Sequence, residues 1–195
     1  MFIAFEGLDG SGSSTHSAAI AQRLREDEYD VVLTKEPTDN VIGGIIRGVL
    51  SHKLTMTPET LQLLFSADRG HHLMEIEPWL KEGKIVMTDR YMMSTFAFGS
   101  LSIDDPEWLK ALNSKFKEPD LTILIKVDPE ECIRRINASR GRTELFEDVD
   151  KLKKIWKRYE ELSKELHNVI IIDGNPGIKE VQENIYEVIK KRLKK

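Results

Sequence analysis

An apolar run followed at once by glycines and hydroxyl residues occupies residues 2–15, which read FIAFEGLDGSGSST. The run predicts a strand over 2–5, and apolar residues at helical spacing predict a helix from Ser14 to about Glu26. A strand, a glycine-rich turn and a helix in this order direct several backbone N–H groups, and the positive end of a helix dipole, at one point. The ligand that we expect there is a phosphate chain.

The stretch is close to the phosphate-binding pattern G-x-x-x-x-G-K-[ST], in which lysine reaches the outer phosphates and Ser/Thr holds Mg²⁺. Gly7 and Gly12 fit the two glycines, and Ser14 fits the metal-side hydroxyl. Ser13 stands where the pattern has its lysine, so the match fails at its one charged residue. The expected ATP-binding residues are Gly7, Leu8, Asp9, Gly10, Ser11, Gly12, Ser13, Ser14 and Thr15.

Two other interpretations of this stretch remain open at this point. One is a glycine-rich turn with no ligand. The other is a dinucleotide-binding turn, but Gly7, Gly10 and Gly12 read G-x-x-G-x-G rather than G-x-G-x-x-G.

Composition bounds the class of protein. The 195 residues suit a single domain spanning 1–195, with an ordinary 40% of apolar and 32% of charged residues. A net charge of −4 predicts no nucleic-acid partner. Cys132 is the one cysteine, which excludes an intrachain disulfide and fits a reducing, cytoplasmic setting. We expect no signal peptide, because the first apolar run is short, and no membrane span.

Short apolar runs alternate with helical patterns along the chain. Strands are predicted at 2–5, 31–33, 85–87, 121–127 and 169–172. Three helices are predicted with both ends, at about 14–26, 41–50 and 147–166. A further helix is predicted to begin at 57–58 and to continue through Ile76. For three more helices only the start is predicted, at Pro106, just after 128–129 and at 178. This alternation predicts an α/β fold whose parallel sheet is covered on both faces. The fully apolar run Val31-Val32-Leu33 predicts a central strand.

Polar clusters follow three of these strands, at Gly7–Thr15, Lys35–Thr38 and Thr88–Arg90. The carboxyl ends of parallel strands lie at one edge of a sheet, so we expect the clusters to meet there. Alone, Asp89-Arg90 would be a local ion pair. Beside a phosphate site, Asp89 can reach Mg²⁺ through water and Arg90 can bind phosphate oxygens with its forked guanidinium.

Two further segments allow a structural or a functional interpretation. Residues 134–142 carry Arg134, Arg135, Arg140 and Arg142, either as a solvated loop or as a lid, at about 134–148, that brings arginines over a phosphoryl group. Phe65 could stack on a base with Arg69 one turn away, although its spacing from apolar neighbours favours the core.

The adjacent His71 and His72 make a poor metal pair.

Five stretches together carry a family resemblance: FEGLDGSGxST, KEPT, LLFSADR, TDRYxxSxxAF and PDLTILIKV. In this order, over residues 2 to about 165, the sequence resembles thymidylate kinases of the P-loop nucleoside-monophosphate kinase class. The resemblance implies a three-layer α/β/α P-loop kinase fold with five parallel strands in the order 2-3-1-4-5. It also implies a homodimer built on helices, and transfer of a phosphoryl group from Mg²⁺-bound ATP to dTMP, giving dTDP.

Roles for single residues follow from the resemblance by position. Asp9 would accept the 3′-hydroxyl, Phe65 would stack on thymine and Arg69 would bind its carbonyl edge. Arg90 would bridge the two phosphates, and Phe98 would disfavour a 2′-hydroxyl. The implied substrate-binding set is Asp9, Glu36, Pro37, Arg47, Phe65, Arg69, Arg90, Ser94 and Phe98. The catalytic set is Asp89, Arg90, Arg140 and Arg142, with Ser14 and Asp89 on the metal side.

The departure from the family is Ser13. Some members place an arginine inside the phosphate-binding turn, but this chain has Gly10 there, so the turn has no cation. Our hypothesis is that Arg140 or Arg142 supplies the charge, in which case Arg142→Ala should lower turnover far more than dTMP binding. Two alternatives remain: a kinase of another or of several deoxynucleoside monophosphates, and a nucleotide-binding homologue with weakened catalysis and a regulatory role.

Overall fold

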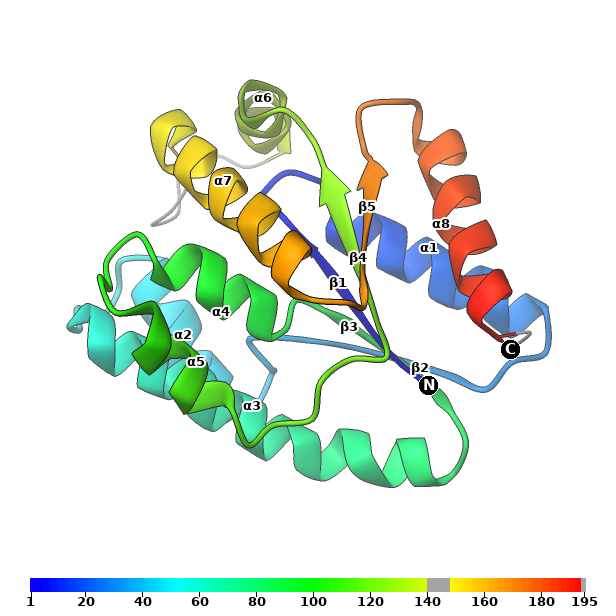
Figure 1. Ribbon diagram of the computed structural model, residues 1–195, viewed down its shortest axis with the longest axis horizontal. Coiled ribbons are helices and arrows are strands. Elements are labelled where there is room, and N and C mark those ends of the chain that lie inside the picture. The colour runs from blue at the N-terminus through cyan, green and yellow to red at the C-terminus, as the bar shows by residue number, and fades with distance from the viewer. Residues whose placement is uncertain (140–147, 194–195) are drawn as a thin grey trace.

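Five parallel strands form the centre of the fold, in the order β2-β3-β1-β4-β5 (Figure 1). The computed structural model describes residues 1–139 and 148–193. The strands are β1 (Phe2–Gly7), β2 (Val31–Lys35), β3 (Ile85–Asp89), β4 (Leu121–Lys126) and β5 (Val169–Asp173). The predicted α/β class and strand order are therefore confirmed.

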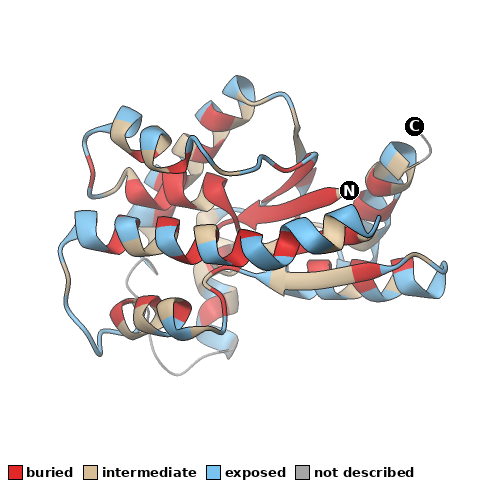
Figure 2. Ribbon diagram, turned by 90° about the horizontal axis from the view of Figure 1, so that it is seen from below, coloured by how far each residue is buried: buried red, intermediate tan, exposed pale blue. Residues whose placement is uncertain are grey.

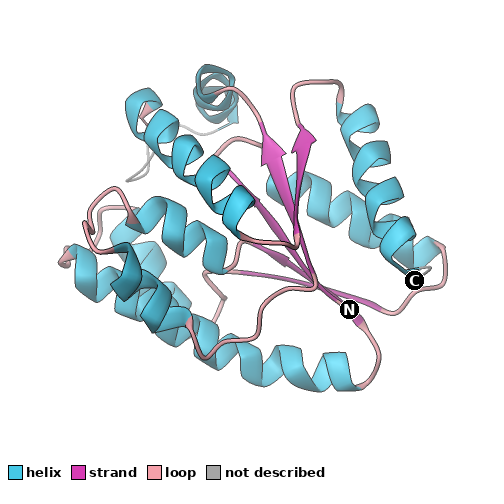
Figure 3. Cartoon of the chain, in the orientation of Figure 1, coloured by secondary structure: helices cyan, strands magenta, loops and turns pink. Residues whose placement is uncertain are grey.

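Helices cover both faces of this sheet, which makes three layers (Figure 3). The helices α1 and α8 pack on each other on one face, and α3, α4 and α7 lie on the other, with α2 packed on α3 and α5 on α4. Their bounds are α1 (Ser13–Glu26), α2 (Val41–Leu50), α3 (Pro58–Lys81), α4 (Met92–Gly99), α5 (Pro106–Asn113), α6 (Pro129–Ser139), α7 (Val149–Glu165) and α8 (Ile178–Leu193).

Several helices begin where the sequence places a capping side chain. Thr57 accepts from the backbone N–H of Thr60, with Pro58 at the first helical position of α3. Asn40 caps α2 and Asp148 caps α7 in the same way. Because these caps are local, the starts of these helices follow from sequence patterns alone.

The main core lies between the sheet and the two helical layers. All six residues of β1 are buried, and the buried positions of the helices face the sheet (Figure 2). A smaller cluster around Ile46, Val49 and Leu61 joins α2 to α3. Within the part of the chain that the structure describes, we find no helix long and apolar enough to cross a membrane.

The prediction of a central strand at Val31–Leu33 is wrong. This run lies in β2, which is an edge strand, and only its first residue, Val31, is buried. The apolar run reflects helix packing against this edge, because α1 contacts β2. Strands β2 and β3 also continue further than expected, so that Lys35 and Asp89 are the last residues of strands rather than loop residues.

The sequence patterns missed α4. Seven of its eight residues are buried, so it has no polar face and no amphipathic stripe. The residue before it, Tyr91, is its N-cap and makes no side-chain capping hydrogen bond, so the local start signal is absent too. In addition, α6 continues to Ser139, so that Arg134 and Arg135 of the 134–142 segment lie on a helix rather than in a loop.

Candidate active site

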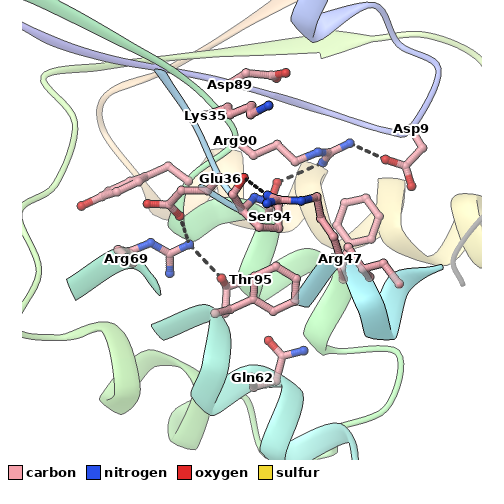
Figure 4. Close-up of a pocket in the computed structure, with 15 residues that line it drawn as sticks. Asp9, Lys35, Glu36, Arg47, Gln62, Arg69, Asp89, Arg90, Ser94 and Thr95 are labelled. Atoms are coloured by element: carbon pink, nitrogen blue, oxygen red, sulfur yellow. Dashed lines mark hydrogen bonds and ion pairs between the residues drawn. The ribbon is translucent and has the colours of Figure 1, made fainter. Parts of the chain in front are cut away.

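A cavity of about 250 Å³ opens at the carboxyl edge of the sheet, between β1, β2 and β3 and the helices α2, α3 and α4 (Figure 4). All nine residues of the expected substrate-binding set line it. Its complete lining is Asp9, Lys35, Glu36, Pro37, Arg47, Leu50, Gln62, Phe65, Arg69, Asp89, Arg90, Tyr91, Ser94, Thr95 and Phe98.

The turn from β1 into α1 depends on glycine at two positions. Gly10 has φ +83°, and a Cβ there would lie 2.5 Å from the carbonyl oxygen of Cys132. Gly12 has φ +90° and is the N-cap of α1. Such left-handed backbone excludes most side chains. An arginine at position 10 would therefore be strained in the turn of this chain.

Two serines at the start of α1 bind one carboxylate at the end of β3. The hydroxyl of Ser13 donates to Oδ1 of Asp89 at 2.7 Å, and the hydroxyl of Ser14 donates to Oδ2. Ser13 is buried, whereas Ser14 is exposed. The residue that replaces the lysine of the phosphate-binding pattern is thus held by the acidic residue on the neighbouring strand.

Arg90 lies at the centre of the site, next to the glycine-rich turn between β1 and α1. Its Nη1 donates to the carbonyl of Gly7 at 3.0 Å and to Oγ of Ser94 at 3.1 Å, and its Nη2 donates to Asp9 at 2.5 Å. Burial lowers the pKa of Arg90, but the charges around it, Asp9 first, outweigh this and raise the pKa above its ordinary value. The guanidinium is therefore permanently charged and aimed at Asp9.

The backbone of Arg90 is left-handed, with φ +69°, which is a strained conformation for a residue other than glycine. It is held by hydrogen bonds from its own N–H to the carbonyl of Phe5 at 2.8 Å and from Thr88 Oγ1 to its carbonyl at 2.9 Å. This strain directs the arginine into the site.

A buried carboxylate below Arg90 replaces the missing cap of α4. Glu6, on β1, accepts the backbone N–H groups of Tyr91 and Ser94 at 3.0 and 3.1 Å with Oε1. Its Oε2 accepts the hydroxyl of Ser94 and that of Tyr159, the latter at 3.0 Å. Burial raises the pKa of Glu6 to about 7, although Ser94 and Arg90 act in the opposite direction. Ser94 thus uses its hydroxyl within this network.

The wall of the cavity formed by Arg69 and Glu36 holds a buried ion pair. Arg69 Nη2 donates to Glu36 Oε2 at 2.7 Å and to Thr95 Oγ1 at 3.1 Å, and both charged side chains are almost fully buried. His72 Nδ1 lies 3.1 Å from the other oxygen of Glu36. Glu36 therefore fixes Arg69 at the cavity wall, and His72 is a core residue rather than a metal ligand.

Aromatic rings and a third arginine complete the wall. Phe65 is partly buried against the cluster around Ile46 and Leu61, and it also lines the cavity. Stacking of Phe65 on a base stays a prediction. Phe98 lies beneath Arg90, with the guanidinium carbon 4.9 Å from the ring centroid. Arg47 Nη1 donates to the carbonyls of Pro37, at 3.2 Å, and Thr38.

Sequence reasoning missed some lining residues. Thr95 binds Arg69, and Gln62 has a buried Oε1 with no hydrogen-bond partner among residues 1–139 and 148–193. Both lie one residue or one turn from a predicted site residue, Ser94 or Phe65. The helical geometry of α4 and α3 was the signal that could have found them, but α4 itself had not been predicted.

The predicted lid is only partly described. Arg134 and Arg135 lie on α6 and both bind Glu131, at 2.6 and 2.7 Å. Arg140 and Arg142 lie outside the described residues. In the part of the chain that the structure covers, no three His, Cys, Asp or Glu side chains are grouped in a way that could hold a metal ion.

Comparison with known proteins agrees with this geometry. The family model for thymidylate kinase matches residues 5–185. A probable thymidylate kinase from Thermococcus onnurineus is 35% identical to this chain, and the match covers 100% of both chains. A probable thymidylate kinase from Methanocaldococcus jannaschii is 36% identical, and the match covers 97% of this chain and 96% of that one. A solved thymidylate kinase structure from Candida albicans superposes with a TM-score of 0.82 at 24% identity, over 98% of this chain and 91% of that one, which supports the fold. The chain belongs to the thymidylate kinase family.

Proposed function

We propose that this protein transfers the γ-phosphoryl group of ATP to dTMP, giving dTDP and ADP. The observation that carries the proposal is a cavity walled by Phe65, Phe98 and Arg69 that opens onto the phosphate-binding turn at Asp9 and Arg90. One end of this cavity suits a pyrimidine base and the other end suits phosphate.

The base end supports a ligand with both a hydrogen-bond donor and an acceptor. Arg69 Nε and Gln62 Oε1 are buried and have no partner within the described ranges. A buried group without a partner costs about 1–3 kcal/mol. Thymine carries ring carbonyls and an N–H, and it is flat enough to lie against Phe65. At the sugar, Asp9 is the acceptor for the 3′-hydroxyl.

The transfer step needs positioning and charge stabilisation rather than a general base. A dTMP phosphate oxygen is already anionic, so it attacks the γ-phosphorus directly. The bond from that phosphorus to the bridging oxygen then breaks, and ADP leaves with the electron pair. Arg90 can bind oxygens of both phosphates because its guanidinium lies beside the turn.

The residues present fit Mg²⁺. Ser14 and Asp89 place a hydroxyl and a carboxylate in contact, and oxygen ligands are those that Mg²⁺ prefers. We propose that these two residues hold the ion, directly or through water. When bound, it would neutralise charge on the phosphate chain of ATP.

A homodimer is part of the proposal. An outward stripe on α3 carries exposed Leu63, Ala67 and Met74, of which Met74 is 72% exposed. These positions follow one face of the helix, and small residues between larger apolar ones let two helices approach. A lid at about 134–148 and a cytoplasmic location remain predictions.

The test is ADP release from Mg²⁺·ATP with dTMP, dUMP, dGMP, dCMP and UMP as acceptors, with Arg90→Lys as a disabled control. We expect turnover selective for dTMP. Preference for another acceptor would keep the chemistry and contradict the substrate. No turnover with any acceptor, together with binding of ATP, would favour the regulatory homologue.

A further inference from the structure

The active site lacks a cation where P-loop kinases have one. Ser13 occupies that position, and its hydroxyl is used by Asp89. The charge on the transferring phosphoryl group must therefore be met by another side chain. Among the residues that the structure describes, the cations that line the acceptor cavity are Lys35, Arg47, Arg69 and Arg90.

The three arginines are already held in place. Arg69 is buried and paired with Glu36. Arg47 donates to two backbone carbonyls. Arg90 is bound by Asp9 and Gly7, and the proposed function assigns it to bridging the phosphates. None of them can move to the position of the missing lysine without breaking these contacts.

Lys35 differs from the arginines in both position and freedom. It is the last residue of β2 and pairs in register with Asp89 on β3, the carboxylate that binds Ser13 and Ser14. It lines the acceptor cavity and also the neighbouring cavity of about 580 Å³ that contains Ser14. Lys35 therefore lies between the acceptor side and the metal side of the site.

The orientation of Lys35 agrees with this position. In Figure 4 the Lys35 side chain extends in the same direction as those of Asp89 and Arg90, toward the side of the cavity where Asp9 lies. Among residues 1–139 and 148–193 its one ion pair is with Asp39, at 3.0 Å; the Asp39 side chain is 75% exposed and also lies 3.7 Å from Arg47. Such an exposed pair contributes about 0–1 kcal/mol and is readily exchanged for a phosphate.

We propose that Lys35 supplies the cation of the phosphoryl-transfer step in place of the P-loop lysine. Its ammonium leaves Asp39 and binds an oxygen of the γ-phosphoryl group as charge develops between ADP and the dTMP phosphate. A flexible four-carbon stem with a compact charge suits this movement from the edge strand. The proposal rests on the function proposed above and adds to it the origin of the missing charge.

The experiment compares Lys35→Met with the wild type in turnover number, KM for dTMP and, by calorimetry, the dissociation constant of dTMP. Lys115→Met is the matched control, because Lys115 is an exposed lysine outside both cavities. We expect Lys35→Met to lower the turnover number on the order of 10²-fold, as removal of one preorganised donor does. The dissociation constant of dTMP should change less than threefold, and the melting temperature should stay unchanged because Lys35 is exposed.

Restoring the charge from position 13, on α1, makes the test specific. Lys35→Met combined with Ser13→Lys should recover most of the lost turnover, whereas Ser13→Lys combined with Lys115→Met should behave as Ser13→Lys alone. Recovery by a lysine on α1 cannot result from a structural role of Lys35 on β2.

Three results would overturn the proposal. One is Lys35→Met turnover within threefold of the wild type. Another is a loss that lies in dTMP affinity alone, and the third is a loss of turnover that Ser13→Lys does not restore. If Arg142→Ala abolishes turnover while Lys35→Met does not change it, the charge comes from the predicted lid. A wild type that never uses dTMP contradicts the proposed function itself, and this outcome is visible before any variant is made.

Discussion

Tyr159 donates its hydroxyl to Glu6 at 3.0 Å, joining residues 153 positions apart in the sequence. This contact links α7 to the first strand, β1. Glu6 in turn holds Ser94, which accepts a hydrogen bond from Arg90. A buried chain of hydrogen bonds therefore runs from α7 to the central arginine.

We predict that Tyr159→Phe lowers the turnover number more than it weakens dTMP binding. The variant keeps the ring, which packs on Phe98, and removes the hydroxyl that donates to Glu6 and also lies 2.9 Å from Oγ of Ser94. Loss of one buried hydrogen bond should also cost about 1–2 kcal/mol of unfolding free energy. Steady-state kinetics and urea unfolding measure the two effects.

The control for this variant is Tyr29→Phe. Among the described residues, the Tyr29 hydroxyl accepts only a long hydrogen bond, 3.4 Å, from Lys190 on α8. Equal kinetics for both variants would show that the network does not position Arg90.

We predict that the contribution of Glu6 to the free energy of unfolding decreases as the pH rises from about 4.5 to 7. Burial raises the pKa of Glu6 from 4.5 to about 7, so the folded protein binds this proton more tightly than the unfolded chain does. Stability from such a group is complete at low pH and is lost as the unfolded chain ionises. At about 1.4 kcal/mol per pKa unit, the loss is roughly 3 kcal/mol.

Urea unfolding of the wild type and of Glu6→Gln at several pH values tests this. The glutamine does not titrate, so the variant should gain stability relative to the wild type as the pH rises. Parallel stability curves would contradict a raised pKa at Glu6.

We predict that Glu36→Gln destabilises the fold strongly. The change removes the negative charge that pairs with Arg69, where both side chains are buried. Leaving one charge of a buried pair uncompensated costs about 3–5 kcal/mol. Calorimetry should show a large decrease in melting temperature.

The matched control is Glu183→Gln, which breaks the exposed pair with Arg23 on the opposite face. Such pairs contribute about 0–1 kcal/mol. Similar losses for the two variants would mean that burial of the Glu36–Arg69 pair has no consequence for stability.

We predict that Cys132 reacts slowly with thiol reagents in the folded protein. Burial raises the pKa of its thiol to about 12, and the reactive form is the thiolate. Labelling with a chromogenic disulfide at pH 8 should be fast in denaturant and slow without it. Fast labelling of the native protein would show that the helix carrying Cys132 opens readily.

Much of the site was predictable because its signals are local. The glycines at 10 and 12, the cap Thr57 with Pro58, and the polar residues after each strand are read from neighbouring positions, and the predicted substrate residues do line one cavity. The roles assigned to them from the family resemblance remain predictions. The edge position of β2 was not predictable from its apolar run, because helix packing covers an edge strand as well as a central one.

What the sequence by itself determined is the glycine-rich turn between the first strand and the first helix, the alternation of strands and helices, and the absence of a lysine at position 13. Only the tertiary structure decided that Glu6 caps α4, that Asp89 binds Ser13, and that Lys35 is the less constrained cation beside them. The physical reason is distance along the chain. A local cap or turn depends on adjacent residues, whereas these contacts join residues far apart in sequence that meet only when the parallel strands pair in register.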